Sequence, residues 1–234
     1  MIPALILFVS FVVAARVLKS ILPNGLRKKC KSPLHVCLAY QIVSTVCVCR
    51  LSYLGWYGII HDPGDMTTPV QRVYGATKTG TTLGYFMANY QLWNFAVSLL
   101  IPQYRTVPLL LHHATTALLS FLSTTPYLQS YSLFYIGISE ISSIPLAIVD
   151  VDKLVDLDRK NLVMVAKVVF AVLFILLRVV MWTAVNASFY RDMVSLSVLD
   201  AYSILFVTSN VGLTGLQYYW ASKIVKSARK MMKM

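Results

Sequence analysis

The strongest constraint on the fold of this chain is a succession of seven apolar runs joined by short connectors. The runs cover about residues 3–22, 33–57, 79–101, 106–122, 131–149, 161–185 and 198–222. A helix of about 20 residues crosses roughly 30 Å of hydrocarbon, so each run predicts one transmembrane helix. The sequence therefore predicts an all-α integral membrane protein with about seven transmembrane helices.

Composition excludes two other classes of protein. The 234 residues are 57% hydrophobic and 13% charged, whereas a soluble domain spends about 25% of its residues on charge. The formal net charge of +12 could suggest nucleic-acid binding. However, the basic residues gather at the ends of apolar runs and form no basic groove with interleaved aromatic residues. We expect membrane lipids as partners and no nucleic acid.

Charge asymmetry predicts the orientation. With a lumenal N-terminus, seven helices place 15 of the 21 basic residues in cytosolic segments, as the positive-inside rule requires. The lumenal loops hold only Arg72, Lys78 and Arg191, and six or eight helices would break this pattern. We therefore predict a cytosolic C-terminus. The chain divides into an N-terminal helix with a basic loop (1–32), a membrane domain (33–222) and a basic tail (223–234).

No metal site or resident cofactor is expected. The four cysteines lie near the N-terminus without the spacing of a zinc site. The four histidines are at positions 35, 61, 112 and 113, too few for a membrane di-iron desaturase. No lysine lies inside the last apolar run, where a retinal Schiff base would need one.

The run at 79–101 carries two stripes at helical spacing. The small stripe allows close approach of another helix and consists of Ala76, Gly80, Gly84 and Ala88. The polar stripe consists of Thr82, Tyr85, Asn89 and Trp93. Polar side chains in a bilayer usually face the bundle interior or a cavity, so the polar stripe either lines a ligand site or packs the bundle.

A histidine pair lies in the next run. Successive helical residues point about 100° apart, so the imidazoles of His112 and His113 cannot project identically into one site. One could act as base, acid or nucleophile while the other orients it. Thr116 follows one turn later. A purely structural role in packing remains the alternative.

A carboxyl group lies in the run at 131–149. Near mid-membrane, Glu140 needs a partner or a proton. If the short turn at 124–126 makes a helical hairpin, Glu140 could approach the histidine pair and tune it; alternatively, a protonated Glu140 bonds to a neighbouring helix. Arg178, in the outer part of its span, is expected to extend to the membrane interface.

These residues define the candidate site. The catalytic candidates are His112, His113 and Glu140. The ligand-binding candidates are Tyr85, Asn89, Trp93, Thr116, Ser139, Ser143 and Asn210.

In order, four segments resemble the motifs of the TLC-domain family, which includes the ceramide synthases. They are 84–90 (Gly-Tyr-Phe-Met-Ala-Asn-Tyr), His112-His113, 140–145 (Glu-Ile-Ser-Ser-Ile-Pro) and 216–220 (Leu-Gln-Tyr-Tyr-Trp). The resemblance extends from about Thr79 to the C-terminus. It implies six helices in a barrel around a lipid-sized cavity, long-chain acyl or sphingoid ligands, and residence in the endoplasmic reticulum. Whether the chain forms a homo-oligomer is left open.

Two functions follow from this resemblance. Ceramide synthases transfer an acyl group from acyl-CoA, as a co-substrate, to a sphingoid amine, and the basic cytosolic face would attract CoA phosphates. However, they carry paired aspartates after the histidines, where this chain has Glu140 and serines, and an acidic residue where this chain has Asn89. The chain thus looks closer to the small non-synthase members. We expect a lipid-binding protein of membrane lipid homeostasis, with N-acyl transfer by His112 and His113 as the alternative.

Overall fold

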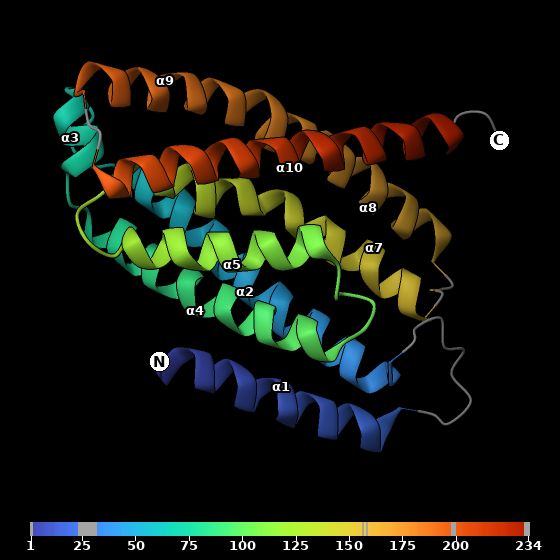
Figure 1. The fold of residues 1–234 in the computed structure, drawn as a ribbon. Helices are drawn as coiled ribbons and strands as arrows, with labels where there is room; N and C mark the ends of the chain where they lie inside the picture. The colour runs from blue at the N-terminus through green and yellow to red at the C-terminus, as the bar shows by residue number, and fades with distance from the viewer. Residues whose placement is uncertain (1, 23–31, 156, 158, 198–199, 232–234) are drawn as a thin grey trace.

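Each of the seven apolar runs forms helix in the computed structural model, which describes residues 2–22, 32–155, 157, 159–197 and 200–231 (Figure 1). Four of the helices are α1 (Ile2–Ile21), α2 (Leu34–His61), α4 (Lys78–Leu100) and α5 (Val107–Leu122). The last helix is α10 (Ala201–Met231). No β-strand occurs in the described residues. The prediction of an all-α membrane protein is confirmed.

The two remaining spans are composite helices. One joins α6 (Gln129–Ser132), the π-helical segment η1 (Leu133–Gly137), the 3₁₀ segment η2 (Ile138–Ser142) and α7 (Ser143–Val155). The other joins α8 (Lys160–Leu173), the π-helical segment η3 (Phe174–Met181) and α9 (Trp182–Ser195). π-Helical segments are rare and occur frequently at functional sites.

The structure also differs from the expected boundaries. The connector between the predicted runs 33–57 and 79–101 contains a short helix, α3 (Pro69–Tyr74), because Thr68 accepts a hydrogen bond from the amide of Gln71 and Pro69 fits the first turn. The span predicted to end at 185 continues to Ser195. The first nine residues of the predicted basic tail continue α10 to Met231, since Lys, Arg, Ala and Met are good helix formers.

Spanning capacity is unevenly distributed among the helices. Within the described part of the chain, four segments are long and apolar enough to cross a bilayer: 3–21, 34–61, 129–155 and 160–195. Helix α5 is apolar but shorter. Helices α4 and α10 have 23 and 31 residues, enough length to span. Helix α4 is less apolar because it buries polar residues such as Gln91 and Asn94 against its neighbours.

The helices run back and forth between two ends of the bundle (Figure 1). One end, here called the α3 end, holds α3 and the start of α10. The other, here called the tail end, holds the C-terminal end of α10 and the connection between α4 and α5. Helix α1 lies at the periphery beside α2 and α4, and its Phe11 ring packs edge-on against Trp93 with centroids 6.1 Å apart. The other six spans are therefore free to enclose an interior.

Small residues set the closest helix approaches. A Cβ atom added at Gly84 would lie 2.7 Å from Oγ of Ser123 and 3.0 Å from the carbonyl oxygen of Ser120. At Gly80 it would lie 2.8 Å from Cβ of Gln129. The small stripe of α4 therefore packs against the end of α5 and the start of α6, as its spacing predicted. This contact fixes the depth of the histidine pair, which lies on α5.

Candidate functional site

Two cavities of different character lie between the helices. The wide cavity has a volume of about 480 Å³ and is lined by residues of α2, α4, α5, α7, α10 and the segment from α8 to η3. Its lining includes Lys153 and Lys223 near the tail end. The narrow cavity, of about 70 Å³, has a mostly apolar surface, to which Leu128 and Phe189 contribute toward the α3 end. Six spans thus surround an interior, while a regular closed barrel stays a prediction.

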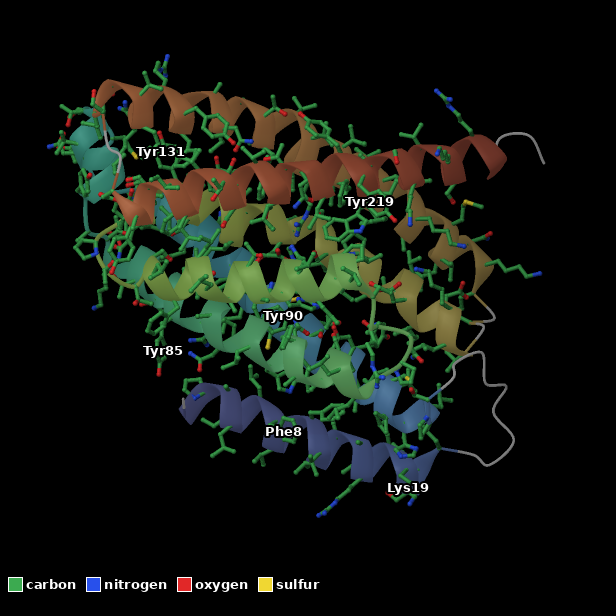
Figure 2. The ribbon with its side chains drawn as sticks, viewed as in Figure 1. Phe8, Lys19, Tyr85, Tyr90, Tyr131 and Tyr219 are labelled. Carbon is green, nitrogen blue, oxygen red and sulfur yellow. The ribbon has the colours of Figure 1, made fainter. Side chains whose placement is uncertain are left out.

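Three polar residues line both cavities: His112, Glu140 and Arg178. They come from α5, η2 and η3, so three separate spans meet at one level of the bundle. Figure 2 shows the side chains of these helices, with Tyr131 toward the α3 end and Tyr219 on α10 toward the tail end. The two predicted catalytic residues His112 and Glu140 are therefore brought to a single site.

The site contains a buried ion pair. Nη2 of Arg178 donates to Oε1 of Glu140 at 2.8 Å, and Nε donates to Oγ of Ser142 at 2.9 Å. Ser143 donates to the second carboxylate oxygen at 3.0 Å. A buried charge is stable only when it is paired and hydrogen-bonded. This geometry favours an ionised Glu140 over the protonated alternative.

The expectation for Arg178 is wrong. The residue is only 6% exposed and points into the bundle, whereas we expected it to extend to the membrane interface. The reason is Glu140. Inside hydrocarbon, an ion pair with a carboxylate stabilises the guanidinium group more than extending the side chain to the interface. Glu140 itself hydrogen-bonds to Arg178 and Ser143, and no hydrogen bond joins it to either histidine in the described structure.

His113 has a partner that the sequence did not indicate. Its Nδ1 lies 2.6 Å from Oε1 of Gln91 on α4. An amide oxygen can only accept, so Nδ1 carries the proton and Nε2 keeps its lone pair. Nε2 is buried and makes no hydrogen bond to any described residue. The arrangement presents a neutral imidazole with a basic nitrogen, the form needed for a nucleophile or a general base.

His112 is held by contacts between aromatic rings. Its ring meets the edge of Trp220 on α10 at a centroid distance of 5.4 Å, and lies 5.5 Å from the ring of His113. Its Nδ1 is buried and makes no hydrogen bond within the described ranges. The two imidazoles project differently, as helical geometry predicted: His112 lines both cavities and His113 lines only the wide one.

The remaining predicted site residues divide into two groups. Three line a cavity: Thr116 and Asn210 the narrow one, and Ser143 the wide one. The other four line neither cavity: Tyr85, Asn89, Trp93 and Ser139. Tyr85 is 46% exposed on the outside, Asn89 donates back to the carbonyl oxygen of Tyr85, and Trp93 stacks on Tyr40 in the core. The buried half of the polar stripe, Asn89 and Trp93, therefore packs the bundle, whereas Thr82 and Tyr85 face outward.

Sequence reasoning missed two residues that organise the site, Arg178 and Gln91. For Arg178, the signal was present: a cation and Glu140 in two adjacent apolar runs can neutralise each other. Gln91 gave a weaker signal, because it lies off the polar stripe by two residues. Only the crossing of α4 and α5 shows that it meets His113.

Charged residues also mark the mouth of the wide cavity. Lys153 donates to Asp150 at 2.7 Å, and the ammonium of Lys223 lies 4.4 Å from the centroid of the Tyr219 ring. All of them belong to the tail end, which the charge asymmetry predicts to be cytosolic. A basic mouth would attract anionic ligand groups.

Comparison with known proteins identifies a family. A family model described as the TLC domain matches residues 38–226. The matched range contains every residue that lines the two cavities, and it leaves out α1. No curated protein and no solved structure matches the chain significantly.

Proposed function

The chain belongs to the TLC-domain family, and on this premise we propose that it is a multi-pass protein of lipid metabolism or homeostasis that binds long-chain acyl or sphingolipid ligands between its helices. The observation that carries the proposal is the change of polarity along the interior. Both cavities reach His112, Glu140 and Arg178. Only the wide cavity is also lined by His113 and by further charged residues near the tail end, whereas the surface of the narrow cavity is mostly apolar.

This polarity matches an amphipathic ligand. The wide cavity, at about 480 Å³, falls in the usual range of roughly 300–1,000 Å³ for ligand pockets. The polar end of a lipid would lie there, near the tail end, with its chain directed toward the narrow cavity. His112, Glu140 and Arg178 would lie at the transition between head group and chain.

A lipid-loading experiment tests this proposal. Ala147 lines the wide cavity and makes no side-chain hydrogen bond, so Ala147→Trp fills space without breaking polar contacts. The matched control is Val168→Trp, on the lipid-facing surface of α8. We expect mass spectrometry to find lipid retained by the wild type and the control and lost from Ala147→Trp. Equal lipid in all three proteins would show that the lipid is bound elsewhere.

Acyl transfer is the second candidate, favoured by the free Nε2 of His113. This atom would attack the carbonyl carbon of an acyl-CoA thioester, the C–S bond would break, and the CoA thiolate would leave and take up a proton. The acyl group would then pass to a lipid amine, whose proton is released as the imidazole is restored. An acyl group covalently bound to the wild type and absent from His112→Ala/His113→Ala would support this candidate.

The cellular setting is part of the proposal. Family membership and the basic tail end support residence in the endoplasmic reticulum, with the N-terminus lumenal and the tail end cytosolic. In that orientation the wide cavity faces the compartment where acyl-CoA is soluble.

A further inference from the structure

One amide oxygen in the wide cavity is shared by two donors. Oε1 of Gln91 lies 2.6 Å from Nδ1 of His113 and accepts a longer bond, 3.4 Å, from Nδ2 of Asn94. Gln91 and Asn94 are three residues apart on α4 and so lie on the same face. All three side chains line the wide cavity. The shared oxygen therefore sets the hydrogen-bonding roles of both neighbours.

Each neighbour is left with an acceptor atom. When Nδ1 of His113 donates to Gln91, its Nε2 can only accept, and when Nδ2 of Asn94 turns to Gln91, its Oδ1 remains as an acceptor. Neither atom makes a hydrogen bond to any residue that the structure describes. Both residues are buried, His113 at 5% exposure and Asn94 at 2%. Buried acceptors without partners are destabilising unless a ligand supplies the missing donors.

We propose that Nε2 of His113 and Oδ1 of Asn94 form a two-acceptor site for a lipid head group that carries two neutral hydroxyl groups. This inference rests on the proposed function, because it names the class of lipid that the wide cavity takes. Gln91 is the positioning residue of the site. One hydroxyl donates to each acceptor, and Gln91 orients both side chains in the same cavity because both bond to its Oε1 atom.

The two acceptor atoms, and the pairing of the nearby carboxylates, favour hydroxyl groups over charged groups. The oxygen atoms of a carboxylate or phosphate can only accept hydrogen bonds. They would face Nε2 of His113 and Oδ1 of Asn94, which also accept, and the contact would be repulsive. An ammonium group would need a carboxylate, but both carboxylates of the cavity lining are already paired, Glu140 with Arg178 and Asp150 with Lys153. A neutral donor meets neither obstacle.

Matched synthetic lipids test the proposal. The probes are hexadecane-1,2-diol, its dimethyl ether, which has no donor, and hexadecylamine, each titrated into purified protein and followed by native mass spectrometry. Two neutral hydrogen bonds should make the wild type prefer the diol over the ether by roughly ten- to thirtyfold. Asn94→Leu should reduce this preference to a few-fold. Asn89→Leu is the control on the same helix, because Asn89 lines neither cavity.

A second measurement is decided on the wild-type protein, so its main result does not depend on whether a variant folds. In wild-type protein labelled with ¹⁵N-histidine, His113 should show a protonated Nδ1 and an unprotonated Nε2, and Gln91→Leu should lose this preference. The opposite tautomer in the wild type would overturn the proposal. Equal affinity for diol and ether would overturn it while leaving lipid binding intact, as would tighter binding of the amine. If none of the probes binds, the proposed function fails as well.

Discussion

Gly55 of α2 and Gly137 of η1 meet backbone to backbone, so that a Cβ atom at Gly55 would lie 2.5 Å from the Cα of Gly137. No side chain intervenes, and the next residues after Gly137 form η2, which carries Glu140. The contact therefore fixes the position of the ion pair relative to α2.

Gly55→Ala should destabilise the protein, since a methyl group has no space there and backbone must move. We expect a loss of about 1–3 kcal/mol in the free energy of unfolding, typical of overpacking, measured by thermal unfolding in detergent. Gly212→Ala is the matched control, because a Cβ atom at Gly212 meets nothing within 4 Å. Because Ala is a better helix former than Gly, the control should be neutral or stabilised, and a similar loss in both variants would contradict the α2–η1 contact as the cause.

Arg178→Leu should be strongly destabilising, because it leaves the carboxylate of Glu140 buried without its cation. Removing one partner of a buried ion pair costs about 3–5 kcal/mol. The double variant Arg178→Leu/Glu140→Leu should recover much of that loss, since it buries no charge. A double-mutant cycle of unfolding free energies measures the coupling. Additive effects would contradict the pairing.

At the α3 end, Arg72→Ala should release α3 from α9. Arg72 makes two hydrogen bonds to Asp192, at 2.6 and 2.7 Å, and one to the carbonyl oxygen of Met66. The bond to Asp192 raises the pKa of Arg72 further, so the guanidinium keeps its charge at every accessible pH. We expect faster amide hydrogen exchange over 69–74, measured by mass spectrometry, and no change in the exposed neighbour variant Arg191→Ala.

Orientation is testable with exposed single cysteines. In a background where the native cysteines are replaced by serine, Lys226→Cys at the tail end should react with a membrane-impermeant maleimide from the cytosolic side. Lys78→Cys, near the α3 end, should react only after the membrane is permeabilised. Labelling of both positions from one side would contradict the predicted topology.

The sequence predicted the helices better than the contacts between them. Hydrophobic run length depends on local composition, so the seven helical runs, and the runs that carry His112 and Glu140, could be placed in advance. Partner choice depends on how helices rotate and cross. The sequence could not show that Glu140 faces Arg178, that His113 faces Gln91, or that Tyr85 points outward, because each depends on the relative rotation of two helices.

The composite helices explain part of this difficulty. Helical spacing of 3.6 residues per turn assigns faces correctly only in a regular α-helix. The spacing changes in η1, η2 and η3. Glu140 lies in η2, directly after η1, and Arg178 lies in η3. A period of 3.6 residues therefore assigns the wrong helix face to these two charged residues.

The π-helical geometry of η3 has a consequence for sequence comparison. A π-helical turn is an α-helical turn that has accommodated one additional residue. Deleting one residue near Phe174 would leave a continuous helix of nearly the same length but would rotate everything beyond it by about 100°. Arg178 would then leave Glu140. Related chains that keep the pair should keep the extra residue, and those that lack it should align here only with a gap of one position.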